Sequence, residues 1–178
     1  MAVKSLAKEK KWHVVYTRSR AEKKVHADLK AMEIECFLPL QKLLRQWKDR
    51  KKWIEVPLMT GYCFVRINSL EFDKVLRASN VVAYVVFEKK AAVIPDIQIE
   101  YLQTMVRQSE FEIRVSRDTF MPGKRVEVIA GPLMGLQGEL MEEQGKNHFV
   151  LRIEAINTVF MAVVPAENLT ALPPVYSF

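Results

Sequence analysis

Glycine and proline are scarce in this chain of 178 residues, which contains 6 of the first and 8 of the second. So few of either exclude a collagen-like repeat and a low-complexity linker protein. Long apolar runs are also missing, since no stretch approaches the roughly 18 apolar residues of a membrane span. The longest, such as Val81–Phe87, predict buried strands. The charged segment Met1–Lys11 has no apolar block behind it, so it predicts a flexible basic tail and not a secretory signal.

Cysteine is nearly absent as well. The two that occur, Cys36 and Cys63, both have apolar, strand-like surroundings. A secreted disulfide framework usually has more cysteines at tighter spacing. The pattern therefore favours two buried free thiols in a cytoplasmic protein, with a single disulfide as the alternative. We expect no membrane association.

The sequence also lacks the motifs of catalysis. Its three histidines, His13, His26 and His148, do not pair at metal-ligand spacing, and HExxH, CxxC and GxSxG are all missing. The glycine-rich stretch Gly131–Gly138 has no Lys-Ser/Thr ending and lies between predicted strands, so it does not resemble a phosphate loop. We therefore expect a protein that is not an enzyme and has neither a metal nor another cofactor.

Charge is present in quantity but is unevenly distributed. Residues 1–119 contain 23 basic and 15 acidic residues, whereas residues 120–178 contain 4 basic and 6 acidic ones. The net charge of the whole chain, +6, therefore comes from the first part alone. A basic surface favours polyanions through steering and counterion release, although ordinary solubilising charge is an open alternative.

In the first part, helical and strand periodicities alternate. A capping box of Ser19 and Glu22 predicts the start of a helix that ends near Met32, with Ala21, Val25 and Leu29 on its apolar face. Further helices are predicted after Asn68 or Ser69 and from Pro95 to about Gln108, the last with Ile97, Tyr101, Leu102 and Met105 inward. Strands are predicted at Trp12–Thr17, Cys36–Leu40, Leu43–Trp47, Trp53–Leu58, Tyr62–Ile67 and Val81–Phe87. The fold class is therefore α+β, with helices layered on a sheet that contains antiparallel hairpins.

From residue 120 the sequence pattern changes to short strand-like runs separated by turns that contain glycine. The runs Arg125–Ile129, Gln137–Met141, His148–Ile153 and Thr158–Val164 predict a small all-β barrel. At its loop tip, Leu133 and Met134 are expected to be exposed to a protein partner. The expected organisation is a tail at 1–11, a first domain at 12–108, a linker at 109–119, a barrel at 120–172 and a tail at 173–178.

The barrel segment begins with residues Phe120–Gly138, which look like a KOW motif. The motif has a Pro-Gly turn, an alternating strand, a Gly-Pro turn and spaced glycines where the backbone is expected to need positive φ. Its positions here are Gly123, Val126, Val128, Gly131, Pro132, Gly135 and Gly138. Ribosomal proteins also carry this motif. Behind a basic α+β domain that opens with Trp12–Tyr16 and contains Gly61–Val65, it makes the chain resemble the NusG family from Trp12 to Leu172.

This resemblance implies a NusG-like N-terminal α/β sandwich, with helices on an antiparallel sheet, and an SH3-like KOW barrel. It also implies a monomer whose N-terminal domain binds RNA polymerase and whose barrel recruits another partner, such as a ribosomal protein or a termination factor. The segment Val81–Pro95 is more similar to the RfaH-like and UpxY-like antiterminators, which act on selected operons, often those for surface polysaccharides. The implied function is transcription antitermination. The alternatives are a general housekeeping elongation factor and a ribosome-associated KOW protein that binds RNA.

In this family an apolar, aromatic-lined patch docks the clamp helices of the polymerase's largest subunit. The matching positions are Tyr16, Met59, Tyr62 and Phe64. Strand alternation puts Tyr62 and Phe64 on one face, with Cys63 and Val65 on the face that covers the helices. The first face is expected to be free for a partner, and a purely structural core role is the alternative. The chain has Thr60-Gly61-Tyr62 where the family usually has Pro-Gly-Tyr.

Basic residues surround the start of the first helix. A helix N-terminus favours anions, so the cations beside it predict a phosphate-facing site, and the resemblance implies the non-template DNA strand of the transcription bubble as its ligand. The four residues are Arg18, Arg20, Lys23 and Lys24. A solvated charge run is the alternative. The hairpin tip Lys48–Lys52, with Trp47 and Trp53, is a second basic-aromatic surface, for which a cross-strand tryptophan pair is the favoured interpretation.

Overall fold

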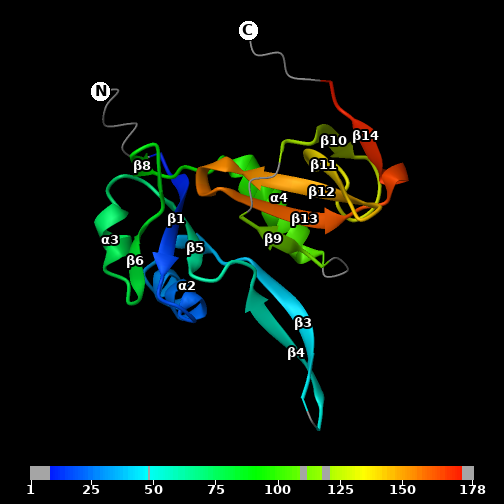
Figure 1. The fold of residues 1–178 in the computed structure, drawn as a ribbon. Coiled ribbons are helices and arrows are strands. Elements are labelled where there is room, and N and C mark those ends of the chain that lie inside the picture. The colour runs from blue at the N-terminus through cyan, green and yellow to red at the C-terminus, as the bar shows by residue number, and fades with distance from the viewer. Residues whose placement is uncertain (1–8, 48, 109–111, 118–120, 174–178) are drawn as a thin grey trace. The chain divides into compact units, whose positions relative to one another are not determined.

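The chain divides into two compact units, Met1–Ile99 and Glu100–Phe178. The structure is a computed structural model, and it describes residues 9–47, 49–108, 112–117 and 121–173. Figure 1 shows the order of the elements along the chain, and each unit is described by itself below. Residues 1–8 and 174–178 of the expected tails, and 109–111 and 118–119 of the expected linker, lie outside the described residues, whereas Lys11 of the expected first tail belongs to a strand.

The first unit is built on a four-stranded antiparallel sheet. The strand order is β2-β5-β1-β6, with β1 at Lys11–Thr17, β2 at Glu35–Phe37, β5 at Tyr62–Ile67 and β6 at Val81–Tyr84. In the central pair β1 and β5, Tyr16 lies opposite Tyr62 and Val14 lies opposite Phe64. Residues directly opposite share a face, so this register fixes which side chains lie together. The predicted strand at Tyr62–Ile67 is confirmed.

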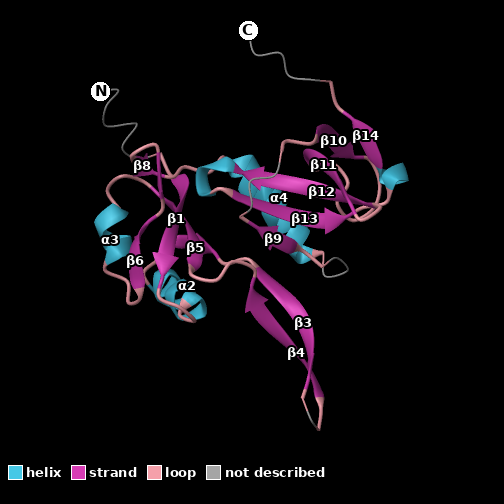
Figure 2. Ribbon diagram, in the orientation of Figure 1, coloured by secondary structure: helices cyan, strands magenta, loops and turns pink. Residues whose placement is uncertain are grey.

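Helices pack on one face of this sheet (Figure 2). Helices α2 and α3 run from Glu22 to Ala31 and from Phe72 to Leu76. Val25 and Leu29 of α2 join Val15, Cys63 and Val65 of the sheet in one buried cluster. The predicted apolar face of the first helix is therefore confirmed for Val25 and Leu29, which lie four residues apart on one side of the helix, whereas Ala21 is the half-buried N-cap.

The other elements of the first unit differ in part from the predicted ones. The strand predicted at Val81–Phe87 is broken, since β6 ends at Tyr84 and a small hairpin of β7 (Val86–Phe87) and β8 (Lys90–Ala91) follows. Helix α3 begins after Glu71, and Asn68 instead accepts a hydrogen bond from the N–H of Leu70 in the preceding turn.

Helix α4 spans Asp96–Arg107, close to the prediction. Leu102 and Met105 are buried as expected and Tyr101 is half-buried. Ile97 is exposed, so its predicted inward position is wrong. Ile97 lies in the first turn, five residues before Leu102, and at about 100° per residue this spacing puts the two side chains on different sides of the helix.

A long hairpin extends from the first unit (Figure 1). Its strands are β3 (Leu40–Gln46) and β4 (Lys51–Pro57), paired from Leu40 opposite Pro57 to Gln46 opposite Lys51. The predicted hairpin is confirmed. The expected tryptophan pair is wrong, because Trp53 lies opposite Leu44 and Trp47 lies beyond the end of β3. In an antiparallel pair the number of one residue rises by one as that of its partner falls by one. Continuing the pairs of this hairpin past Gln46 and Lys51 brings Trp47 opposite Arg50, not opposite Trp53.

The second unit is a six-stranded antiparallel sheet. The order is β14-β10-β11-β12-β13-β9, with β9 at Arg114–Ser116, β10 at Lys124–Val128, β11 at Gln137–Glu143, β12 at Lys146–Ile153, β13 at Thr158–Val163 and β14 at Leu169–Ala171. Short 3-10 helices lie at Glu154–Ile156 and Ala166–Asn168. The four predicted strands of this unit are confirmed. β9 and β14 were not predicted, and β9 lies within the segment expected to be a linker.

Candidate interaction surface

The sheet of the first unit has a second face, opposite the helices, on which aromatic side chains meet. Tyr16 of β1 and Tyr62 of β5 have ring centroids 5.0 Å apart at an angle of 52°, and Phe64 and Phe37 have centroids 6.0 Å apart at 36°. Such offset, tilted pairs are favourable arrangements of aromatic rings. Cys63 and Val65 lie on the helix-covered face, so the predicted division of β5 into two faces agrees with the packing.

Exposure separates Tyr16 from the other three candidates for polymerase binding. Tyr16 is 39% exposed, whereas Tyr62, Met59 and Phe64 are 8%, 3% and 0% exposed. Of the four candidates, only Tyr16 is therefore exposed, and the binding of a partner on this face stays a prediction. Alternation identifies which side chains share a face but not whether other segments cover it. The signal was in the sequence, because four consecutive apolar residues at Tyr62–Val65 are typical of a strand buried on both faces.

The turn before β5 is held by a buried carboxylate. Gly61 has φ +81°, a conformation that glycine adopts without strain, and its N–H donates to Glu22 Oε1 at 2.6 Å. Its carbonyl accepts from the N–H of Thr17 at 2.8 Å. Thr60-Gly61-Tyr62 therefore forms an anchored turn without the family's proline, and this turn sets the position of Tyr62 beside Tyr16.

The same contact overturns the predicted capping box. The N-cap of α2 is Ala21, which makes no side-chain cap, and Ser19 lies two residues before it. Glu22 is buried and bonds to Gly61, so it is not available to Ser19. The physical reason is competition, since leaving the Gly61 N–H without an acceptor would cost more than leaving a helix N-terminus uncapped.

The predicted phosphate-facing residues all lie on the surface at this end of α2. Arg18, Arg20, Lys23 and Lys24 are exposed, and Lys23 donates from Nζ to the carbonyl of Glu55 in β4 at 2.8 Å. The carboxylate of Glu22 already lies in the first turn of the helix. An anionic ligand at the helix terminus would therefore meet a negative charge, and only the basic side chains themselves remain as phosphate contacts.

The positions of the predicted KOW motif lie in β10, in β11 and in the turns on either side of β10. Val126 and Val128 are buried, while Gly131 (φ +83°) and Gly135 (φ +87°) adopt the expected left-handed conformation. Gly138 is needed for a different reason, because a Cβ there would lie 2.5 Å from the carbonyl oxygen of Val150. Gly123 is likewise crowded against the backbone of Leu140, and Pro132 is exposed.

In the loop between β10 and β11, the two expected surface residues differ. Met134 is exposed as predicted, but Leu133 is buried, so its predicted place at the loop tip is wrong. The N–H of Met134 bonds to the carbonyl of Gly131, which closes a tight turn and directs adjacent side chains to different sides.

An ion pair anchors the motif to the second unit's sheet. Arg152 donates to both carboxylate oxygens of Glu139, at 2.8 and 2.9 Å, and Glu139 also accepts from the N–H of Gly123 at 3.0 Å. Burial of the Glu139 carboxyl raises its pKa, but the hydrogen bonds from Arg152 and Gly123 outweigh burial and lower the pKa overall.

His13 and the two cysteines make polar contacts within the fold. His13 Nδ1 lies 2.9 Å from the carbonyl of Ala92, and desolvation by burial lowers its pKa. Both cysteines are free thiols, as predicted, but only Cys63 is buried and Cys36 is half-buried. Across the described ranges, no cluster of three or more His, Cys, Asp or Glu side chains could hold a metal ion. In the same part of the chain, no helix is long and apolar enough to cross a membrane.

Comparison with known proteins found a family model that matches the sequence. The family model for NusG, described as transcription termination factor nusG, matches residues 10–103. A structure concerned with domain interaction in NusG of Thermotoga maritima is 21% identical, covers 93% of this chain and 98% of that chain, and has a TM-score of 0.49. No curated protein sequence matches the chain.

Two conformations of the MjSpt4:Spt5 complex are more distant. They are 15% and 16% identical, cover 90% and 93% of this chain and 97% and 99% of those chains, and have TM-scores of 0.30 and 0.31. The α+β unit followed by a KOW-like β unit defines a protein of the NusG-like class. Because the family model covers more than half of the sequence, the chain belongs to the NusG family of transcription elongation factors.

Proposed function

We propose that this protein binds RNA polymerase through its first unit and suppresses transcriptional pausing and termination. The observation that carries the proposal is the aromatic group on the sheet face opposite the helices, formed around Tyr16, Tyr62 and Phe64 within the family-matched segment. Aromatic side chains are favoured anchors at interfaces, and an amphipathic helix can lie along an apolar surface of this kind. The proposed partner is the pair of clamp helices of the polymerase's largest subunit.

Docking of a partner on this face requires that buried side chains become exposed. Tyr16 is accessible, but Met59, Tyr62 and Phe64 are buried and must be uncovered before they contact a partner. The polymerase then binds the state in which they are exposed and increases its population. Tyr16 is the proposed first contact.

The proposed mechanism is differential binding to two states of the polymerase. A factor that bridges the clamp in its closed, elongating state stabilises that state over the paused one, with no covalent step. Arg18, Arg20, Lys23 and Lys24 are proposed to contact phosphates of the exposed non-template DNA strand. Such contacts add affinity and orientation but carry no sequence information.

We further propose that the protein acts on selected operons, such as those for surface polysaccharides. The support is the resemblance of Val81–Pro95 to the specialised antiterminators. The alternative is a housekeeping factor that acts on all genes, and transcription of templates with and without a candidate recruitment sequence in the non-template strand distinguishes the two. A ribosome-associated RNA-binding role is less well supported, because residues 120–178 carry 4 basic and 6 acidic residues.

Binding of the full chain to core RNA polymerase from its own organism tests the proposal. The site variants are Tyr16→Ala and Tyr62→Ala, and Leu70→Ala is the matched control because Leu70 is a highly exposed apolar residue of the same unit. We expect each site variant to weaken binding at least about tenfold, as for an interface hot spot, and the control to bind like the wild type. Binding that is absent in the wild type, or equal in all four proteins, would contradict the proposal.

A further inference from the structure

The end of the β3–β4 hairpin presents a basic-aromatic face that the proposed function does not use. Arg45 lies opposite Lys52 in the register, and the N–H of Trp47 donates to the carbonyl of Arg50 at 2.8 Å, which continues the ladder by one more pair. Alternate residues of a strand lie on the same side. Arg45, Trp47, Arg50 and Lys52 therefore share one side of the hairpin, here called the tip face.

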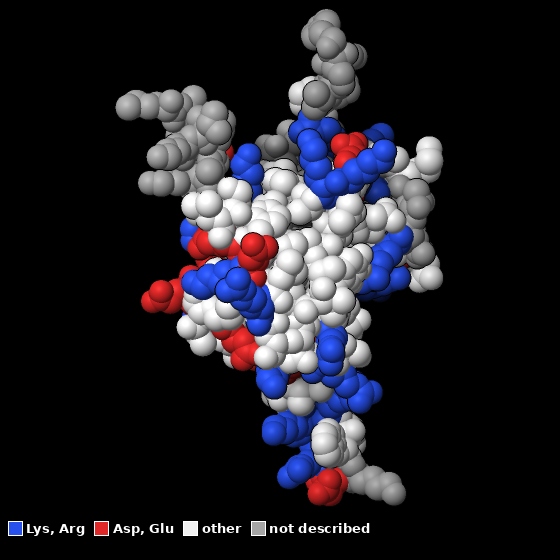
Figure 3. Space-filling model, turned by 90° about the vertical axis from the view of Figure 1, so that its left-hand side faces the viewer, with Lys and Arg blue, Asp and Glu red and all other residues white. Residues whose placement is uncertain are grey.

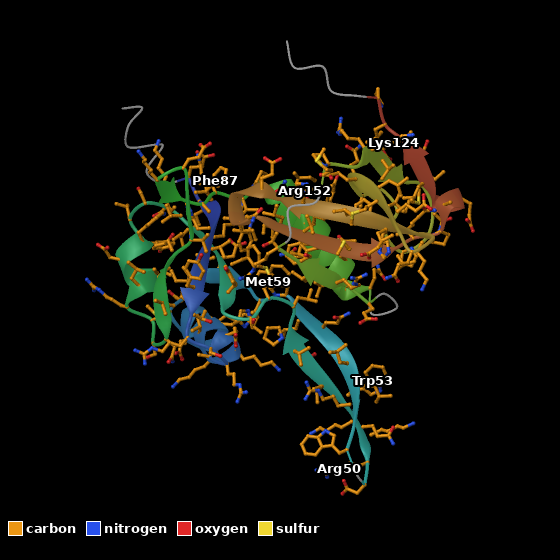
Figure 4. All side chains as sticks on the ribbon, in the orientation of Figure 1. Arg50, Trp53, Met59, Phe87, Lys124 and Arg152 are labelled. Carbon is orange, nitrogen blue, oxygen red and sulfur yellow. The ribbon has the colours of Figure 1, made fainter. Side chains whose placement is uncertain are left out.

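The aromatic member of the tip face is accessible and already stacks on a cation. Trp47 is 53% exposed, and the guanidinium carbon of Arg50 lies 5.7 Å from the centroid of its ring. Arg50 is at the end of the hairpin in Figure 4. A tryptophan with an arginine beside it is a combination on which nucleic-acid bases stack, because every base has a π face and arginine contributes a cation–π contact.

The tip face carries two cations, Arg45 and Lys52, side by side on neighbouring strands. Arg45 and Lys52 are directly opposite each other, an arrangement of like charges that destabilises a hairpin. Within the described residues, neither forms an ion pair with a carboxylate. Figure 3 shows Lys and Arg side chains gathered along the hairpin. A bound polyanion would remove this repulsion.

The other side of the hairpin has a different composition. Trp53 lies opposite Leu44, with Lys42 opposite Glu55 on the same side. Trp53 is even more exposed than Trp47, at 65%. Its neighbours on that side are one cation, Lys51, an apolar side chain and a pair of opposite charges, against three cations around Trp47. The two sides therefore supply two tryptophans of similar exposure in different electrostatic surroundings.

We propose that the tip face binds single-stranded nucleic acid, with a base stacked on Trp47 and the neighbouring phosphates held by Arg45, Arg50 and Lys52. An unpaired strand fits better than a duplex, because the bases of a duplex already stack on each other. The site consists of other residues than Arg18, Arg20, Lys23 and Lys24, and it does not depend on polymerase. DNA and RNA share the chemistry that it recognises.

Titration of the full chain with labelled oligonucleotides tests this site. The probes are a deoxythymidine strand and a uridine strand of about 12 nucleotides, within the range of known single-strand site sizes, and a duplex of the same length, at about 50 mM salt. The variants are Trp47→Ala with Trp53→Ala as its control, and Lys52→Ser with Lys51→Ser as its control. Intrinsic fluorescence reports on the exposed tryptophans, because Trp12, the only other one in the sequence, is buried.

We expect saturable binding to at least one single strand and weaker binding to the duplex. Trp47→Ala should lower the affinity about tenfold and abolish fluorescence quenching, whereas Trp53→Ala should change the affinity less than about twofold and keep the quenching. Lys52→Ser should reduce the slope of log K against log salt by about 0.7, the value for one phosphate contact, and Lys51→Ser by less. The better single-stranded probe identifies DNA or RNA as the ligand.

Three results would overturn the proposal. They are no saturable binding to any single strand, tighter binding to the duplex, and equal losses in Trp47→Ala and Trp53→Ala. Neither tryptophan is in the core, so thermal melting is expected to be unchanged in both variants and separates loss of binding from loss of folding. An acidic peptide that competes fully with the oligonucleotide would also contradict the assignment, because it would show a site for charge without stacking.

Discussion

Glu22 joins two parts of the first unit through a single contact. Its carboxylate is buried and accepts the N–H of Gly61 at 2.6 Å, so it fixes the turn that leads into Tyr62. Glu22→Ala leaves that N–H without an acceptor, and we expect the free energy of unfolding to fall by about 1–3 kcal/mol. Glu22→Gln keeps an acceptor oxygen and should recover most of the loss. Urea denaturation measures both, and an alanine variant as stable as the wild type would contradict the role.

Glu139 makes the stability of the second unit decrease at low pH. Its pKa is lowered in the folded state from an ordinary value of 4.5, so it stabilises the fold above that pH, and this stabilisation is lost as the pH falls through the folded-state pKa. Glu139→Gln should reduce the free energy of unfolding by about 2 kcal/mol at neutral pH, and the difference from wild type should shrink as the pH falls below 4.5. Chemical denaturation across this range is the measurement, and a difference that does not change with pH would argue against the ion pair with Arg152.

Both cysteines should be unreactive in the native protein. Burial raises the pKa of the Cys36 thiol to about 11 and that of Cys63 further still, so at neutral pH almost no thiolate, the reactive species, is present. We expect iodoacetamide to label neither within the time that labels both in denaturant, with Cys36, the less buried one, reacting first. Mass spectrometry counts the adducts. Rapid native labelling of Cys63 would show that this strand of the sheet opens.

At the scale of elements, the strands predicted most accurately from the sequence are those with a recognisable turn at one or both ends. β5 was predicted at both of its ends, and the two strands of the hairpin were recognised from the basic turn between them. The start of α2 was predicted wrongly, because the local pattern of Ser19 and Glu22 could not show that Gly61, 39 residues away, binds the Glu22 carboxylate. β9 was missed because a three-residue strand has too few positions to show alternation.

Gly138 in β11 and Gly145 between β11 and β12 are required for two different reasons, crowding at the first and a left-handed backbone at the second. A Cβ on Gly138 would press on the backbone of Val150 and the ring of Phe149, whereas a Cβ on Gly145 (φ +71°) would meet nothing within 4 Å. We expect Gly145→Ala to cost about 1–2 kcal/mol, the penalty of a left-handed alanine, and Gly138→Ala to cost more, because the sheet itself must shift. Thermal denaturation ranks the two. The opposite order would contradict the assigned packing of β11 against β12.

At the scale of the whole molecule, charge and motif predicted two domains of different character with a boundary at 109–119. The chain divides into two compact units after Ile99, and the predicted boundary stays a prediction. The family-matched segment lies in the basic part of the chain. The sequence could also predict that Tyr62 and Phe64 share a face, because alternation along one strand determines it. It could not predict that Phe64 is completely buried while Tyr16 is exposed, since burial depends on segments that lie far away in the sequence. The sequence therefore identified the residues of the candidate surface but not which of them are accessible to solvent.

Site-specific photo-crosslinking tests the central proposal most directly. A photoreactive phenylalanine analogue replaces Tyr16, the exposed member of the aromatic group, and in a control protein it replaces Leu70. Each full chain is then irradiated with an elongation complex of its own organism's RNA polymerase. We predict an adduct with the largest polymerase subunit from position 16, mapped by mass spectrometry to the clamp helices, and none from position 70. No adduct from position 16, or the same adduct from both positions, would contradict polymerase binding through this face of the sheet.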